Sequence, residues 1–296
     1  MSPASPMVRP MRPDDVATAE RLSAEAFLDV DRRMLRAGDP EPALRPATRA
    51  GDWRSRTEHL LRTDPGGCWV AEGETGMLGF ATSLVRETTW VLATFAVRPE
   101  HQGQGLGRAL LGAALHHGRG CLHGMLAASD DPRAVRTYAA AGFSFHPQMT
   151  LEGTVDRSVI PVVSKVREGS AGDTELLDSV DRRARGAAHG PDHAWMQDAW
   201  RLIVSDTSTG SGYAYLSGGG RLELLAATNR RTATRMLWAA LADGPATTAV
   251  RHVTAANAWA VEVGLAARLA LRTEGYLALR GVPRPPAPYV HHGALL

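Results

Sequence analysis

Residues 97–111 read VRPEHQGQGLGRALL, with glycine at three alternate positions, Gly103, Gly105 and Gly107. The preceding run, WVLATFAV at 90–97, is almost entirely apolar, which predicts a strand buried on both faces. The residues from Leu106 onward have the apolar spacing of a helix. The chain is therefore expected to pass from a buried strand through a glycine loop into a helix, which indicates an α/β (α+β) fold.

A loop of this kind predicts an anion site. The first N–H groups of a helix have no intrahelical partner and carry partial positive charge, and phosphate oxygens satisfy both. Glycine lets a phosphate approach the backbone because no side chain is in the way. Gln102, Gly105 and Gly107 thus predict a phosphate or pyrophosphate site, and a tight turn without a ligand is the alternative.

Two common nucleotide motifs do not fit the loop. A kinase-type P-loop ends in Gly-Lys-Ser/Thr, whereas Gly107 is followed by Arg108. The dinucleotide pattern G-x-G-x-x-G ends on Arg108 when it is started at Gly103, and on Leu110 when it is started at Gly105.

The chain carries an internal echo of this strand–helix pattern. The order strand, strand, helix, strand, helix recurs in the second half, where GYAYLS, RLELLAAT, TRMLWAALADG and VTAANAWAV follow one another. The pattern loosens after about Thr150, so we expect one domain over residues 1–150, a connecting or strand-exchange region over 151–168, and a second domain over 169–296. The last part, from Pro283, is rich in proline and is expected to be extended.

Two motifs of the first half resemble those of the GCN5-related N-acetyltransferase (GNAT) family. The acyl-coenzyme A loop of that family, Gln/Arg-x-x-Gly-x-Gly/Ala after a strand ending in Val-x-Pro, is matched at Val97, Pro99, Gln102, Gly103, Gly105 and Gly107. The next family motif, Asn-x-x-Ala-x-x-x-Tyr-x-x-x-Gly-Phe, is matched at Asp131, Ala134, Tyr138, Gly142 and Phe143, with Asp in place of Asn. The resemblance covers about residues 7–150 and, with the echo, implies two GNAT-like domains, each a mixed, mostly antiparallel sheet flanked by helices.

The resemblance implies transfer of an acetyl group from acetyl-CoA to a primary amine, by direct attack in a ternary complex. It places the acetyl-CoA contacts on Phe95, Ala96, Val97, Gln102, Gly103, Gln104, Gly105, Leu106, Gly107, Arg108, Asp131 and Ala134. Tyr138 stands at the family's general-acid position, where a phenol protonates or hydrogen-bonds the departing thiolate. The structural alternative for Tyr138 is a ring packed on the sheet. Asp131 brings a negative charge towards the phosphates unless Arg133 or Arg136 compensates.

The base that takes the proton of the amine is less clearly marked. The family's strand carboxylate would fall on Val91, which cannot act as a base. Glu87 lies just upstream, Glu72 and Glu74 are further candidates, and the terminal carboxylate of Leu296 is another, because some multi-domain relatives bring the C-terminus into the site.

The second half lacks the glycine loop and the tyrosine, since TNRRTAT and Gly264 occupy their places. It is therefore expected to be a degenerate GNAT-like domain without acetyl-CoA. His189, Asp192 and His193 follow a Gly/Pro loop; we expect Asp192 to cap a helix and His193 to lie in its first turn, with an acceptor or interdomain contact as the alternative and no metal site, because the ligands are too few. The pairs His116–His117 and His291–His292 are expected at exposed or helix-end positions.

Composition limits the alternatives. The formal net charge is +2, which does not favour a nucleic-acid groove or a membrane patch, and two cysteines suit a reducing compartment. With no signal-peptide core or long apolar run, we expect a cytoplasmic protein. The leading hypothesis is an N-acetyltransferase for a small-molecule amine, and a homodimer is a family expectation. A non-catalytic acyl-CoA-binding module and an enzyme acting on a protein amine are the alternatives.

Overall fold

The computed structural model describes residues 6–296, which form two compact units. The first unit runs to Leu126 and adds Asp130–Gly142, and the second comprises Ala127–Ser129 and Phe143–Leu296. Each unit combines mostly antiparallel strands with helices, as the sequence predicts. The division falls before the expected boundary near residue 150, because the strand Ser144–Thr154 pairs with two strands of the second unit.

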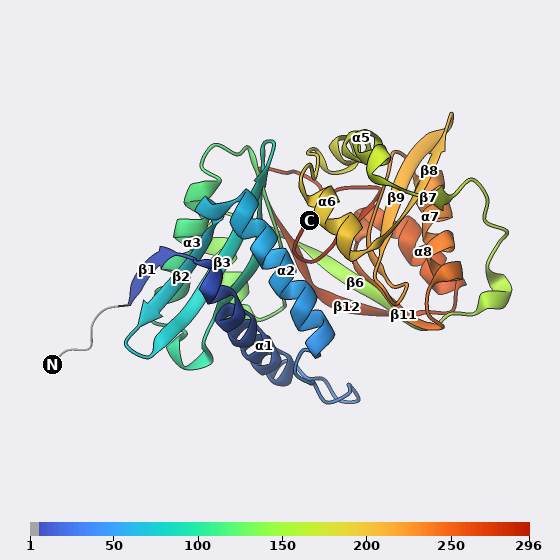
Figure 1. Ribbon diagram of the computed structural model, residues 1–296. Coiled ribbons are helices and arrows are strands. Elements are labelled where there is room, and N and C mark those ends of the chain that lie inside the picture. The colour runs from blue at the N-terminus through green and yellow to red at the C-terminus, as the bar shows by residue number, and fades with distance from the viewer. Residues whose placement is uncertain (1–5) are drawn as a thin grey trace. The chain divides into compact units, whose positions relative to one another are not determined.

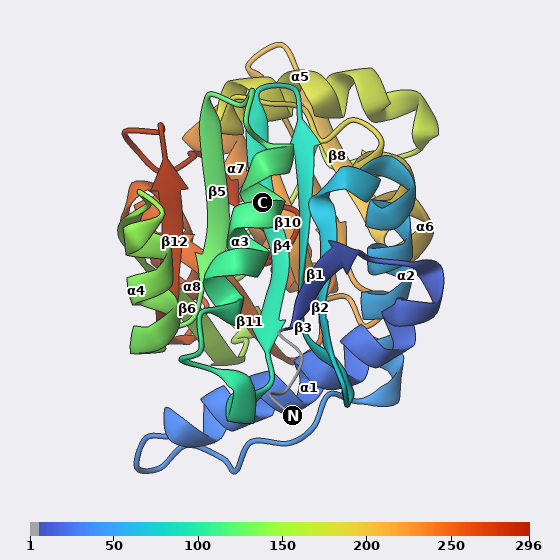
Figure 2. The same ribbon diagram turned by 90° about the vertical axis from the view of Figure 1, so that its left-hand side faces the viewer.

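The first unit is built on a sheet with the strands in chain order (Figure 1). Its strands are β1 (Met7–Pro10), β2 (Cys68–Gly73), β3 (Gly76–Arg86), β4 (Thr89–Val97) and β5 (His123–Ala128). Helices α1 (Val16–Arg33) and α2 (Ala47–Thr63) lie on one face and α3 (Leu106–His117) on the other, while α4 spans Pro132–Ala140 (Figures 1 and 2). The buried strand predicted at 90–97 and the helix predicted from Leu106 are confirmed.

Strand β4 separates from β5 part-way along its length. The two strands pair in parallel only from Thr89 opposite His123 to Leu92 opposite Leu126. At that point β4 also bulges against β3, since Thr82 pairs with Thr94 but Ser83 pairs with Leu92. A bulge bends a strand and ends its regular pairing. The last residues of β4 therefore keep β3 as their neighbour but leave the pairing with β5.

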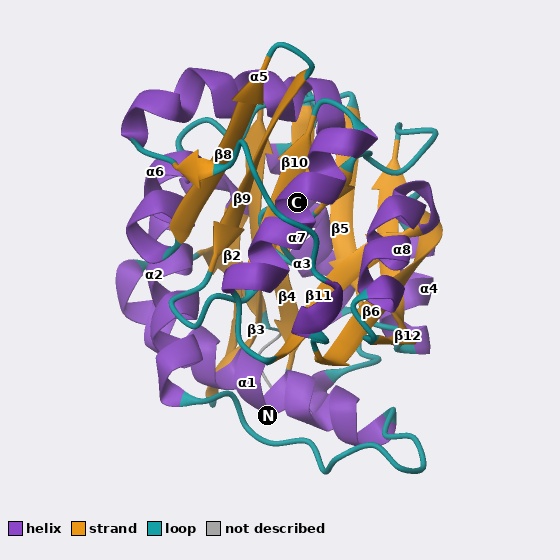
Figure 3. Ribbon diagram, turned by 90° about the vertical axis from the view of Figure 1, so that its right-hand side faces the viewer, coloured by secondary structure: helices purple, strands orange, loops and turns teal. Residues whose placement is uncertain are grey.

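The second unit repeats the order of elements of the first, as the internal echo predicts. Strands β9 (Gly210–Leu216) and β10 (Leu222–Ala227), helix α7 (Arg230–Asp243), strand β11 (Thr247–Thr254) and helix α8 (Ala258–Ala266) correspond to β3, β4, α3, β5 and α4. Its remaining elements are β6 (Ser144–Thr154), β7 (Arg167–Glu168), α5 (Thr174–Arg185), α6 (Asp192–Ala199), β8 (Arg201–Thr207), β12 (Ala270–Arg280) and β13 (Tyr289–Val290). β13-β10-β9-β8-β7 form one set of neighbours and β12-β6-β11 another, and α7 covers β9 and β10 (Figure 3).

The proline-rich tail completes the second unit. Strand β13 pairs with β10, with Val290 opposite Leu225, so it lies on the edge of β10 that corresponds to the β5 side of β4. Asn257, the residue that echoes Asp131, holds this tail: its Nδ2 donates to the Pro286 carbonyl at 2.9 Å, and its Oδ1 accepts from the Tyr289 N–H at 2.8 Å. The tail is extended, as expected, and it fills the place that the first unit leaves beside β4.

Asn257→Ala is expected to lower the free energy of unfolding of the second unit by about 2 kcal/mol, because buried polar groups of the tail would lose their partners. The Tyr289 N–H and the Trp259 Nε1–H both donate to Asn257 Oδ1. Urea unfolding followed by circular dichroism measures the change. Asn229→Ala is the matched control: it removes the cap of α7 near the surface, for which about 1 kcal/mol is expected. Equal losses in the two variants would contradict the role given to Asn257.

Among residues 6–296, no helix combines the length and the apolar character needed to cross a bilayer.

Candidate functional site

The glycine loop presents bare backbone at the start of α3. Gly105 is the N-cap of the helix with φ +86°, and Gly103 has φ +78°, a region that residues with a side chain rarely adopt. Both glycines are exposed, and a Cβ built on either would meet no atom within 4 Å. The loop is therefore open to solvent and shaped by its backbone, as an anion site at a helix N-terminus requires.

The Gln102 side chain fixes the loop between β4 and α4. Its Nε2 donates to the Val97 carbonyl at 3.0 Å, and its Oε1 accepts from Arg133 Nη1 at 2.9 Å. One amide thus ties the end of β4 to the first turn of α4. Gln102 supports the shape of the loop through these contacts.

Phe95 connects the loop with Tyr138. The ring centroids of Phe95 and Tyr138 lie 6.2 Å apart, and a Cβ at Gly107 would approach Phe95 Cζ to 3.2 Å. Glycine at 107 therefore lets the first turn of α3 pack closely on the Phe95 ring. The structure brings the end of β4, the glycine loop and Tyr138 into one neighbourhood.

Tyr138 is a buried phenol that stays protonated at neutral pH. Its side chain belongs to α4 and the residue is 6% exposed. Burial, with a smaller contribution from the negative charge of Asp131, raises the pKa of Tyr138 above its ordinary value of 10. Within residues 6–296 its hydroxyl has no hydrogen-bond partner, so its proton is free to be donated to a ligand.

Asp131 is held by its own unit. Its Oδ1 accepts from the Arg133 N–H at 2.9 Å, which confirms it as the cap of α4, and its Oδ2 accepts from Arg33 Nη2 at 3.1 Å. Arg33, at the end of α1, thus supplies a guanidinium beside this carboxylate, while the Arg133 side chain donates to Gln102. The expectation that Arg133 or Arg136 would neutralise Asp131 through its guanidinium missed Arg33, which lies far away in the sequence.

Comparison with known proteins agrees with this arrangement. Residues 29–143 match the model of the acetyltransferase (GNAT) family. Residues 29–143 form a GNAT-family domain. A mycothiol acetyltransferase from Saccharopolyspora erythraea is 34% identical over 150 residues, which is 45% of this chain and 48% of that protein. The match therefore spans about half the length of this curated relative.

Solved structures share the fold of the whole chain. A candidate acetyltransferase from Pyrococcus horikoshii superposes with a TM-score of 0.76 at 19% identity, over 100% of this chain and 96% of the other. A GCN5-related N-acetyltransferase from Kribbella flavida gives a TM-score of 0.59 at 17% identity, over 93% of this chain and 72% of the other. At these identities the likeness concerns the fold alone.

The other cofactor residues expected for the GNAT domain lie around the loop or on α4. Ala96 and Leu106 are buried, and Gln104 and Arg108 are exposed. Ala134 is half-buried in the first turn of α4, three residues after the cap Asp131. Gly103, Gln104 and Gly105 thus form a continuous exposed stretch, which ends at the buried Leu106.

The candidate bases do not gather at the GNAT loop. Glu87 is exposed in the turn between β3 and β4, at the opposite end of β4 from Val97, roughly 30 Å away at ~3.3 Å per residue. This placement argues against Glu87 as the base. Glu72 is bound to Arg9 at 2.6 Å. Leu296 is buried in the second unit.

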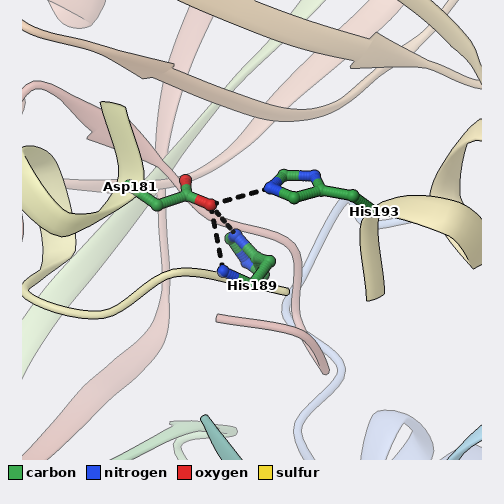
Figure 4. A group of neighbouring side chains, drawn as sticks. All are labelled: Asp181, His189 and His193. Carbon is green, nitrogen blue, oxygen red and sulfur yellow. Dashed lines mark hydrogen bonds and ion pairs between the residues drawn. The ribbon is translucent and has the colours of Figure 1, made fainter. Parts of the chain in front are cut away.

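The second unit contains a buried polar cluster that the sequence reading missed in part (Figure 4). Asp181 on α5, His189 in the following loop and His193 on α6 are all fully buried, with both histidines turned to the Asp181 carboxylate. Burial would raise the pKa of Asp181, but His189 and His193 outweigh it and hold that pKa well below its ordinary value. The sequence analysis named His189 and His193 but not Asp181, because this carboxylate precedes them by 8 and 12 residues and lies on the preceding helix.

Two expectations for the histidine-rich segments are corrected. The N-cap of α6 is Pro191 and no side chain caps it; Asp192 is the first helical residue and is buried, so it does not act as the cap. His291 is 3% exposed and lies 2.6 Å from Gln148, so it is not an exposed histidine. Burial lowers the pKa of His291 to about 3. The inward position follows from the pairing of β13 with β10, which carries the tail into the unit.

Proposed function

We propose that the chain is an N-acetyltransferase that binds acetyl-CoA at the glycine loop of its first unit and transfers the acetyl group to a primary amine of a small molecule. The observation that carries the proposal is the position of Tyr138: a buried, protonated phenol lies against Phe95, on the part of β4 that leads into the glycine loop. A GNAT domain with its general-acid position filled and its loop open supports this reaction.

The separation of β4 from β5 supports a path for the cofactor. From Ala93 to Val97 the strand no longer pairs with β5, so backbone groups on that side are available to a ligand. A backbone N–H there would donate to the thioester carbonyl oxygen as negative charge develops on it. The loop N–H groups at the start of α3 would bind the phosphates.

The chemistry follows from these positions. The nitrogen of the amine attacks the carbonyl carbon, the carbon–sulfur bond breaks, and the sulfur takes the proton of the Tyr138 hydroxyl. Because the pKa of Tyr138 is raised, the phenol is present as a donor throughout the neutral range. The nitrogen loses its proton to a water molecule, which balances the step.

A small-molecule acceptor is the choice that the curated relative favours, since its name refers to mycothiol, a small molecule, and not to a protein. Incubation of the protein with acetyl-CoA and a panel of small amines, with release of free thiol as the signal, tests the class. Release that occurs only with peptide amines would replace this part of the proposal. Binding of acetyl-CoA without release for any amine would favour a non-catalytic module.

The binding of acetyl-CoA predicts a specific loss in Gly105→Glu. In the wild type, ligand at about 100 times its Kd is expected to add about 2.7 kcal/mol to the free energy of unfolding. In Gly105→Glu this gain should vanish, because a carboxylate would occupy the anion position at the start of α3. Thermal unfolding with and without acetyl-CoA measures both.

Gly112→Glu is the matched control, since it adds the same charge to the same helix. Gly112 is exposed, has no positive φ, and a Cβ there meets no atom within 4 Å. This variant should keep the full response to acetyl-CoA. A wild type that shows no response at saturating acetyl-CoA would remove the proposal altogether.

A further inference from the structure

The cluster of Asp181, His189 and His193 in the second unit plays no part in the proposed acetyl transfer. Figure 4 shows the two imidazoles pointing from different elements towards the same carboxylate oxygen. Asp181 Oδ2 lies 2.7 Å from His189 Nδ1 and 3.0 Å from His193 Nε2. One ligand atom from each of the three residues lies within 4.8 Å of the other two.

The far side of each ligand has the partner that a metal ligand requires. His189 Nε2 lies 2.8 Å from the Leu295 carbonyl oxygen, and His193 Nδ1 lies 3.0 Å from the Tyr215 hydroxyl. Histidines that bind metals donate their second N–H to such a group, which fixes the tautomer and aims the other nitrogen at the ion. The second oxygen of Asp181 accepts from the Tyr213 hydroxyl. All three ligands are thus already oriented by fixed neighbours.

Hydrogen bonds alone leave His189 over-supplied with acceptors. A neutral imidazole has a single N–H, yet the two nitrogens of His189 face a carboxylate oxygen and a carbonyl oxygen. A cation bound at Nδ1 removes the conflict, because Nε2 can then carry the one proton and donate it to Leu295. The same assignment leaves His193 with Nε2 on the ion and its proton on Nδ1.

The charges around the cluster favour a divalent cation. Asp181 and Asp192 are fully buried and Asp178 is largely buried, while Arg185 is the buried guanidinium whose charge reaches His189. Three carboxylates and one guanidinium thus surround the two imidazoles. Asp178 Oδ1 lies 3.4 Å from His193 Nε2 and accepts from the Gly190 N–H at 3.0 Å, so this carboxylate adds negative charge beside the three ligands without being one of them.

We propose that Asp181, His189 and His193 bind a divalent first-row transition-metal ion, zinc(II) by preference. Two imidazole nitrogens and one carboxylate oxygen are ligands that zinc accepts, and a water molecule would take the fourth position. Binding replaces the two protons that point at Asp181 Oδ2 and separates the ligand atoms by a few tenths of an ångström. The ion would tie α5 to the loop that follows it and to the start of α6, which makes it a structural ion of the second unit.

Metal analysis of the full chain tests the proposal, and it does not depend on acetyltransferase activity. The affinity tag is removed first, since tag histidines bind zinc. Elemental analysis of the dialysed protein is expected to give about one zinc per chain. Extraction with a chelator should lower Tm, and one equivalent of zinc chloride should restore it. Cobalt(II) chloride added to the extracted protein should give a saturable visible absorption at one ion per chain.

Variants separate the site from general damage. His193→Gln is expected to lower cobalt(II) affinity at least tenfold, whereas His291→Gln, a buried histidine of the same unit outside the cluster, should keep one ion per chain. Retention of full affinity in His193→Gln would overturn the proposal, as would equal loss in both variants. If His193→Gln does not fold, the wild type decides: less than a tenth of an equivalent of metal together with no saturable cobalt(II) binding would show a purely hydrogen-bonded cluster.

Discussion

Tyr138→Phe is expected to lower kcat by about 10²–10⁴-fold, the range that a positioned general acid contributes, while acetyl-CoA binding stays nearly unchanged. The substitution removes one oxygen from a buried ring that keeps its contact with Phe95. Because the hydroxyl has no partner within residues 6–296, the free energy of unfolding should change little. Steady-state kinetics with a responding amine, together with thermal unfolding in acetyl-CoA, measures the three quantities.

The separation of these effects is what distinguishes a general acid from a packed ring. Tyr276→Phe serves as the control, since it removes a half-buried phenol that packs on Phe145 in the second unit. That variant should keep kcat within a few-fold of the wild type. An unaltered kcat in Tyr138→Phe would leave Tyr138 as a packing residue and would end its assignment as the acid, whatever the result for acetyl-CoA binding.

Asp64→Ala is expected to lower the free energy of unfolding of the first unit by about 3–5 kcal/mol, because it leaves a buried guanidinium without its counter-charge. Asp64 is 3% exposed and binds Arg86 Nη1 at 2.8 Å, the Val85 N–H at 2.8 Å and His117 Nε2 at 3.2 Å. Arg86 is itself 5% exposed. Denaturant unfolding of the purified variant measures the loss.

The double variant Asp64→Ala/Arg86→Met tests the cause of that loss. Removing both charges should recover a large part of the stability, since a buried pair is costly to break but much less costly to replace by apolar groups. A double variant less stable than Asp64→Ala would show that the hydrogen bonds to the backbone, and not the charge of Arg86, dominate.

The same pair sets a dependence of stability on pH. Burial would raise the pKa of Asp64, but the hydrogen bond from His117 and the charge of Arg86 outweigh it and lower that pKa to about 2. A carboxyl whose pKa is lower in the folded state stabilises the fold above its ordinary value of 3.8. This contribution is lost as the pH falls from 3.8 to about 2. Asp64→Ala should therefore lose stability less steeply than the wild type over that interval.

The parts of the GNAT domain that sequence predicts well are those where neighbours in the chain are neighbours in space. Gly105 takes a positive φ where the helix begins, Asp131 caps α4 through its own first turn, and Tyr138 follows on the same helix. Local geometry of this kind can be predicted from short sequence motifs, because the contacts span only a few residues. The repeat in the second half could be recognised for the same reason, from the order of its helices and strands and not from identical residues.

Contacts between residues that are distant in the chain could not be predicted from the sequence. Arg33 reaches Asp131 from α1, and Asp181 meets His189 and His193 although they lie 8 and 12 residues further along the chain. A single sequence contains many arginines and aspartates, and it does not indicate which of them pair with one another. The division between the units lies earlier than the expected boundary near residue 150 for a similar reason. The sequence of β6 does not indicate that β11 and β12 are its partners.

The pairing of β13 with β10 also determines the order in which the two units can fold during translation. The sheet of the first unit has all five strands once synthesis has passed Ala128. The second unit cannot close β10 until Val290 has been added, and β6 waits for β12 over more than a hundred residues. Pairing between strands that are far apart in the sequence slows folding and leaves strand edges exposed in the meantime. During translation the first unit can therefore be folded while the second still lacks its last strand. A ribosome that stalls shortly before Tyr289 would hold a folded first unit and a second unit in which the edge of β10 is unpaired.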